Sequence, residues 1–136
     1  MSDCSELYFD GASKGNPGPS GCGWYIKSGG TETPLKGYKY LDITTNNVAE
    51  YSGLIEGLKH IGNSEHLKIY GDSKLVIEQM KGTYKVKAPH LIPLWREAQN
   101  IVKKIKKVEF IHIDRSLNAI ADQLANFAVM NKDCDE

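Results

Sequence analysis

Residues 7–26 read LYFDGASKGNPGPSGCGWYI, and this stretch decides how the fold begins. The alternating apolar run at residues 7–10 predicts a strand that ends in an aspartate. The glycines and prolines of residues 11–21 predict a turn-rich connection, and the run at residues 22–26 predicts a second strand. Together with a third strand farther on, residues 5–42 are expected to form an antiparallel meander.

Beyond a tight turn at Gly29-Gly30, the spacing of the apolar residues changes. Spacings of three and four residues from Val48 to Ile61 predict an amphipathic helix. Polar residues 44–47 supply capping oxygens before it, and Gly62-Asn63 ends it. The same reasoning predicts strands over residues 33–41, 66–70 and 108–113, and helices over residues 74–81, 94–105 and 117–128.

The order of elements implies the topology. Crossover connections are right-handed and consecutive elements tend to be neighbours. Strand 66–70 should therefore pair parallel with the first strand, and strand 108–113 should lie beside it. The expected fold is α/β, with a mixed five-stranded sheet (three antiparallel strands, then two parallel) flanked by helices. Ligands in such sheets lie at the carboxyl ends of the parallel strands.

Length and composition fit one globular unit. The chain has 136 residues, of which 40% are hydrophobic and 25% charged, and we expect a single domain over residues 1–136. No apolar run approaches the ~20 residues of a membrane span. Three scattered cysteines, Cys4, Cys22 and Cys134, do not suit a disulfide framework, which favours a reduced, cytoplasmic location.

The charge is balanced overall but unevenly distributed. The formal net charge is zero, which is unlike a strongly basic nucleic-acid-binding protein. Residues 81–107 nevertheless hold eight basic residues against one acid, Glu97, a local excess of seven positive charges. This basic segment includes Lys85 and Lys87. It is either a solvated face or a surface that contacts phosphates.

Two aspartates are expected at the same edge of the sheet. Asp10 and Asp72 each end one of two neighbouring parallel strands. The residues that follow them, Gly11 and Ser73, are small and leave room for a ligand. Like charges held close together raise each other's pKa unless a cation neutralises them. Hard divalent cations such as Mg²⁺ prefer oxygen ligands of this kind.

Two helical carboxylates extend this pattern. Glu50 shares a helix face with Gly53 and Gly57, and a glycine inside a helix costs about 1 kcal/mol, so the face should pack very closely. Asp122 lies among alanines early in the last helix. Singly, these acids could be turn, helix-dipole or surface residues. Jointly, the four carboxylates predict one metal site.

Other chemistry has little support in the sequence. The histidines show no metal-binding spacing and are interpreted as surface or core residues: His60, His66, His90 and His112. Cys22 is expected to be a small core residue. No Gly-x-Ser-x-Gly motif and no Walker lysine are present.

In these motifs the chain resembles type 1 ribonuclease H, from near its start to about Phe127. The matching segments are YFDGASKGNPGPSG (residues 8–21), TTNNVAEY (44–51), IYGDS (69–73) and NAIADQLA (118–125). The resemblance implies cleavage of the RNA strand of RNA/DNA hybrids with two Mg²⁺ ions, leaving 5′-phosphate and 3′-hydroxyl ends. Mn²⁺ should substitute for Mg²⁺. The implied metal ligands are Asp10, Glu50, Asp72 and Asp122.

The resemblance also implies substrate contacts. Asn16 matches a position beside the 2′-hydroxyls of the RNA strand, a contact that distinguishes RNA from DNA. Thr45 and Asn46 match positions that hold a DNA-strand phosphate and a nearby nucleotide, and both also suit helix capping. Ser73, beside Asp72, and the basic residues Lys85 and Lys87 complete the expected substrate-binding set.

The chain departs from many family members, and its missing histidine loop and missing protrusion resemble the short archaeal-type branch. Ile43 stands where many members place a phosphate-binding arginine. No histidine-bearing loop precedes Asp122, but Arg115 lies seven residues before it and is a further candidate catalytic residue. The segment over residues 82–88 is too short for a long basic protrusion.

Two alternatives remain open. The chain could bind hybrids without cutting them, although binding alone does not need four carboxylates. It could also be a domain of a reverse transcriptase, although its start and end favour a free-standing protein. The expected partner is an RNA/DNA hybrid, with no membrane association, and the expected state is a monomer.

Overall fold

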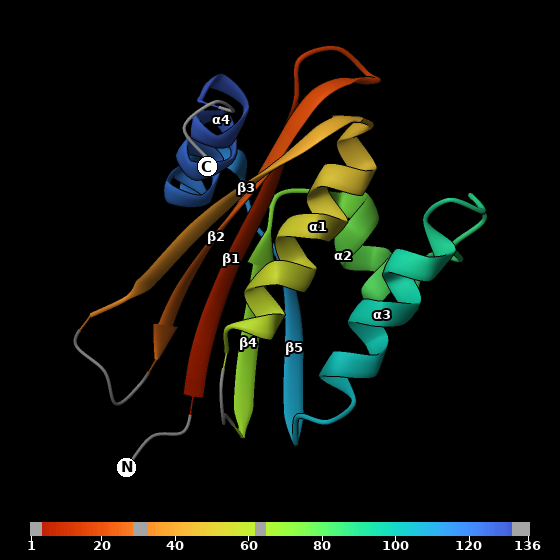
Figure 1. The fold of residues 1–136 in the computed structure, drawn as a ribbon. Helices are drawn as coiled ribbons and strands as arrows, with labels where there is room; N and C mark the ends of the chain where they lie inside the picture. The colour runs from red at the N-terminus through yellow and green to blue at the C-terminus, as the bar shows by residue number, and fades with distance from the viewer. Residues whose placement is uncertain (1–3, 29–32, 62–64, 132–136) are drawn as a thin grey trace.

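The computed structural model describes residues 4–28, 33–61 and 65–131. One five-stranded sheet forms the centre of the molecule (Figure 1), in the order β3-β2-β1-β4-β5. Its first three strands pair antiparallel, and β1–β4 and β4–β5 pair parallel, which confirms the expected mixed sheet. The strands are β1 (Cys4–Ser13), β2 (Gly18–Ser28), β3 (Leu35–Thr44), β4 (His66–Gly71) and β5 (Lys107–His112).

Helices lie on both faces of the sheet. Figure 1 shows α1, α2 and α3 on one side and α4 on the other. Their bounds are α1 (Asn46–Lys59), α2 (Lys74–Lys81), α3 (Ile92–Val102) and α4 (Ala119–Met130), with a 3₁₀ turn, η1 (Arg115–Leu117), before α4. None of the helices in the described part of the chain has the length and apolarity needed to cross a bilayer.

The main core lies between the sheet and α1. Alternate residues of β1 and β4 point into it, because successive side chains of a strand face opposite sides. Leu7, Phe9 and Ile69 are fully buried there, and so is Tyr51 of α1. Cys22 is buried with a free thiol, as expected, and burial raises its pKa to about 12.

The expected close packing of the first helix is confirmed. A Cβ atom added to Gly53 would lie 2.6 Å from the carbonyl oxygen of Asp10, and one added to Gly11 would overlap the backbone of Ala49 and Glu50. The backbone of α1 therefore rests directly on the end of β1. This contact places Glu50 beside Asp10.

The connection expected over residues 11–21 is shorter in the structure. β1 continues to Ser13 and β2 begins at Gly18, and their last pair joins Ser13 to Ser20. β2 pairs with β1 on one side and β3 on the other, so its backbone groups find partners despite the glycines and prolines. The turn at Gly29-Gly30 lies outside the described residues. The first helix ends at Lys59, with His60 as its C-cap, and so stops before the predicted end at Gly62-Asn63.

Two further helices, α3 and α4, also differ from their predicted bounds. The last helix begins at Ala119 rather than residue 117, because the Asp114 carboxylate accepts a hydrogen bond from the Ser116 backbone N–H at 3.1 Å and η1 forms instead. α3 ends at Val102 rather than residue 105. The backbone N–H of Ile105 then donates to the Val102 carbonyl at 3.0 Å in a tight turn.

Candidate active site

Three carboxylates converge where the parallel strands end. Asp10 lies in β1, Asp72 directly follows β4, and Glu50 lies in α1. One oxygen from each lies within 4.8 Å of the other two. All three line an open cleft of about 540 Å³, as predicted from the topology, and the cleft is also lined by Asn46, Ser73, His112, Arg115 and Asn126.

The cleft concentrates negative charge that only a cation would neutralise well. Burial and the neighbouring charge of Asp72 raise the pKa of Asp10 to about 7, and a contact with Asp122 adds to the effect. Burial, followed by the charge of Asp10, raises the pKa of Glu50 well above its ordinary value. A bound divalent cation would reverse these shifts, because it favours the charged carboxylates.

The donor atoms fit a hard cation. Oε1 of Glu50 is buried and has no hydrogen-bond partner among the described residues. A buried polar oxygen without a partner is costly, so the cleft is better satisfied with an ion than without one. Carboxylate oxygens at this spacing are the ligands that Mg²⁺ and Mn²⁺ accept.

Asp122 lies beside the triad rather than within it. It contacts Asp10 but is not part of the group whose oxygens all lie within 4.8 Å of one another. Its Oδ1 lies 3.5 Å from Nη2 of Arg115 and accepts a hydrogen bond from Nδ2 of Asn126 at 3.2 Å. The expectation of four carboxylates at one point is thus met for three, with the fourth adjacent.

Arg115 is placed to reach the cleft. Its side chain is 78% exposed, and its ion pair is with Asp122. Asp114, the neighbouring acid, accepts hydrogen bonds from the backbone N–H and the hydroxyl of Ser116 instead. The guanidinium therefore pairs with Asp122 at the edge of the cleft and is not a surface partner of Asp114.

Three of the residues predicted to contact the substrate accept hydrogen bonds from backbone N–H groups of the chain itself. Oδ1 of Asn16 accepts from the backbone N–H of Asn46 at 3.0 Å, which ties the β1–β2 turn to the start of α1. Thr45 caps α1 through the N–H of Val48, as expected. Ser73 caps α2 in the same way and lines the cleft.

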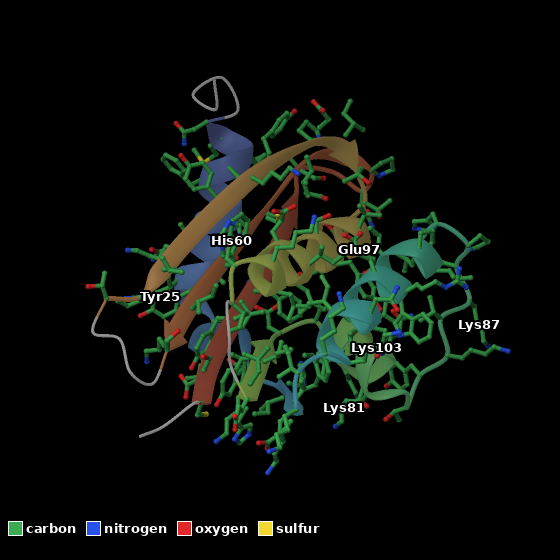
Figure 2. All side chains as sticks on the ribbon, turned by 60° about the horizontal axis from the view of Figure 1, so that its bottom comes forward. Tyr25, His60, Lys81, Lys87, Glu97 and Lys103 are labelled. Atoms are coloured by element: carbon green, nitrogen blue, oxygen red, sulfur yellow. The ribbon has the colours of Figure 1, made fainter. Side chains whose placement is uncertain are left out.

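The two predicted lysine contacts lie farther away. Lys85 and Lys87 are exposed on the segment between α2 and α3 and do not line the cleft. Figure 2 labels Lys81, Lys87 and Lys103 on the side of the molecule that carries α2, α3 and the segment between them. The structure brings these lysines to one side but not to the triad.

Sequence reasoning missed three side chains around the carboxylates. Nδ2 of Asn118 donates to Asp72, and Asn126 donates to Asp122. His112 is exposed, lines the cleft, and lies 3.3 Å from the backbone carbonyl of Asp72. Its place at the end of β5, beside β4, was the signal that could have found it. No sequence pattern marks the asparagines.

Comparisons with known proteins agree with this geometry. The sequence model of a family described as "Reverse transcriptase-like" matches residues 8–128. A bifunctional protein of Mycobacterium tuberculosis is 42% identical over 124 residues, covering 88% of this chain but 34% of its own length. The chain thus spans about a third of that relative, whose N-terminal RNase H domain, solved as a fusion with maltose-binding protein, superposes with a TM-score of 0.87.

Two further relatives match over nearly the whole chain. RNase H1 of Halobacterium salinarum superposes with a TM-score of 0.87 at 34% identity, over 94% of this chain and 98% of that one. LC11-RNase H1, isolated from compost and solved in complex with an RNA/DNA hybrid, gives 0.87 at 36% identity, again over 94% and 98%. With the family match, the sheet order and the carboxylate triad, these likenesses show that the chain belongs to the type 1 ribonuclease H family.

Proposed function

We propose that this chain is an endoribonuclease that hydrolyses the RNA strand of RNA/DNA hybrids and leaves 5′-phosphate and 3′-hydroxyl ends. The triad of Asp10, Glu50 and Asp72 is the acidic metal-binding site typical of the family, and its unpartnered Glu50 oxygen carries the proposal. The hybrid bound in the LC11 structure supports the same substrate for this chain.

The proposed cofactor is a pair of Mg²⁺ ions, for which Mn²⁺ would substitute. A two-ion centre supplies an activated water and stabilises the leaving oxygen in an in-line displacement at phosphorus. Asp10, Glu50 and Asp72 would hold the ions, with Asp122 as the fourth ligand from α4. Asp10 contacts Glu50 and Asp122 and senses the charge of Asp72, so among the four acids it is the one most closely coupled to the others.

Two helix N-termini help this cleft accept a phosphate backbone. α1 begins at Asn46 and α2 begins just after Ser73, and both of these residues line the cleft. Backbone N–H groups and the helix dipole favour anions at such ends. We assign Thr45 and Asn46 to the DNA strand and Asn16 to the RNA strand, with Ser73 beside the cleaved phosphate.

Arg115 is proposed to act electrostatically. An arginine does not shuttle protons near neutral pH, because its pKa stays above ~12. Its guanidinium, beside Asp122, would orient the scissile phosphate or stabilise the departing product. Lys85 and Lys87 would contact phosphates farther along the hybrid. We further propose a monomer, one domain over residues 1–136 and, from the scattered cysteines, a cytoplasmic location.

One assay tests the function. Labelled RNA/DNA hybrid, duplex DNA, duplex RNA and single-stranded RNA are each incubated with Mg²⁺, with Mn²⁺ and with a chelator. The expected result is cleavage of the hybrid's RNA strand with either metal, none with chelator, and product ends that ligase accepts as 5′-phosphates. Hybrid binding without cleavage in either metal would instead identify a binding module.

A further inference from the structure

Asn118 does not do what an asparagine at a helix start usually does. It occupies the N-cap position of α4, where its side-chain oxygen would ordinarily accept a hydrogen bond from the first helical turn. No such bond forms. Instead, its Nδ2 group donates to the Phe9 carbonyl at 2.9 Å and to Oδ2 of Asp72 at 3.1 Å. The side chain thus reaches away from its own helix to β1 and the end of β4.

The Asn118 amide is buried, and only its N–H group has hydrogen-bond partners among the described residues. Asn118 is 1% exposed, and its Oδ1 has no hydrogen-bond partner among the described residues. Leaving a buried acceptor unpaired opposes folding, and an apolar side chain of similar size would fill the space without that cost. The two donated hydrogen bonds are therefore the feature that distinguishes the amide from a packing residue.

Asp72 needs such a partner because its neighbours repel it. Its carboxylate lies near those of Asp10 and Glu50, and like charges at this spacing push one another apart. An N–H donor on Oδ2 offsets part of this repulsion and fixes the rotamer. The same Nδ2 group is anchored on the carbonyl of Phe9, the residue before Asp10, so one amide sets Asp72 relative to the β1 ligand.

We propose that Asn118 is a positioning residue that holds the Asp72 carboxylate in its metal-ligating orientation. This inference rests on the metal centre of the proposed function. Groups that orient metal ligands typically contribute 10- to 100-fold to metal affinity or activity, although they never touch the ion.

The test compares two Asn118 variants with a matched control. Asn118→Ala removes both donated bonds. In Asn118→Ser the hydroxyl lies one bond closer to the backbone, so it no longer reaches the Asp72 carboxylate. Serine is still a good helix cap, so this variant separates the positioning of Asp72 from the stability of α4. Gln99→Ala is the control, since Gln99 also donates an amide N–H to a backbone carbonyl, that of Met80 at 3.0 Å, between α3 and α2 and away from the cleft.

The readout is the Kd for Mn²⁺, from titration calorimetry of each protein, with its melting temperature measured alongside. Both Asn118 variants should weaken Mn²⁺ binding about 10- to 100-fold, and cleavage should recover partly at high metal concentration. Gln99→Ala should bind Mn²⁺ like the wild type. Wild-type affinity in both Asn118 variants, or equal loss in the control, would overturn the inference.

The same data separate this inference from the proposed function. If the wild type binds Mn²⁺ and the Asn118 variants bind it poorly, but no protein cleaves hybrid, then the positioning role stands and the nuclease assignment fails. If the wild type binds no Mn²⁺, both are overturned.

Discussion

At the scale of single residues, the acids of the cleft oppose folding in the absence of a cation. Asp10 is 3% exposed and Glu50 carries a buried oxygen with no partner among the described residues. Neither arrangement stabilises the folded chain without an ion. Residues that cost stability in this way are found where function requires them, and the pKa shifts at Asp10 and Glu50 identify the same place.

The first prediction concerns Asp10, the carboxylate most closely coupled to the other acids of the cleft. Asp10→Asn should abolish cleavage, with a loss of roughly 10³-fold or more, equivalent to more than about 4 kcal/mol of transition-state stabilisation. Hybrid affinity should survive, because the strand contacts come from other residues. Single-turnover cleavage and fluorescence anisotropy on labelled hybrid measure the two quantities. Near-wild-type turnover would contradict the assignment of Asp10 as a metal ligand.

The second prediction concerns Arg115. Arg115→Ala should lower kcat roughly 10- to 100-fold, less than the ~10²–10³ typical of a donor in a dry site, because this side chain is 78% exposed and solvent screens it. Arg115→Lys should recover only part, since a point charge lacks the planar fork. Equal kcat for all three proteins at saturating Mg²⁺ would show that Arg115 is a surface residue with no role in cleavage.

At the scale of elements, the segment between α2 and α3 presents charge without touching the cleft. Lys85 and Lys87 are both exposed there, and no ion pair involving either is found in the described part of the chain. Exposed lysines of this kind contribute to nucleic-acid binding mainly by releasing counterions from the phosphates that they contact.

The third prediction follows from that placement. A Lys85→Gln/Lys87→Gln double variant should weaken hybrid binding and reduce the salt slope of the logarithm of affinity by about one per lost phosphate contact. The matched control is Lys103→Gln/Lys104→Gln, which removes the same charge just after the far end of α3, an 11-residue helix about 16 Å long. A salt slope in the Lys85/Lys87 variant equal to that of the wild type would indicate a solvated face.

The elements themselves were largely predictable, and their ends were not. The apolar spacing from Val48 to Ile61 identified α1, and Gly53 and Gly57 correctly indicated its close packing. The start of α4 was misplaced because a local bond, from Ser116 to Asp114, competes with the helix. Such short-range competition is decided by side-chain geometry, which the apolar pattern does not contain.

At the scale of the whole molecule, topology made the site predictable. Asp10 and Asp72 are far apart in sequence, but the rules for parallel strands place both at one sheet edge, where the structure has them. Asn118 and Asn126 were not predictable, because their contacts depend on how α4 settles against the sheet. The sequence placed Asp122 at the correct edge of the sheet, but it predicted all four acids at one point, whereas Asp122 lies beside the triad.

The fourth prediction concerns the stability of the metal-free molecule. Asp10 has its pKa raised from 3.8 to about 7, so the folded state binds more protons than the unfolded state between these values. Stability should therefore fall as pH rises from about 4 through about 7, by an amount on the order of a few kcal/mol, since one pKa unit corresponds to about 1.4 kcal/mol.

Urea unfolding in chelator at pH 5 and pH 8 measures this effect. Asp10→Asn should be more stable than the wild type at pH 8 and should gain little at pH 5. Saturating Mg²⁺ should stabilise the wild type at pH 8 by mass action and the variant much less. Parallel pH profiles for the two proteins would show that Asp10 does not titrate as its burial implies.

The last described helix carries a consequence for the chain during its own synthesis. α4 supplies Asp122 and, at its cap, Asn118, while β1 at the other end supplies Asp10. A nascent chain that has emerged only as far as β5 therefore lacks both the fourth acid and the amide that anchors Asp72. A growing chain on the ribosome therefore holds the complete set of these groups only after α4 has emerged and docked, so assembly of the proposed metal centre waits for the last element of this fold.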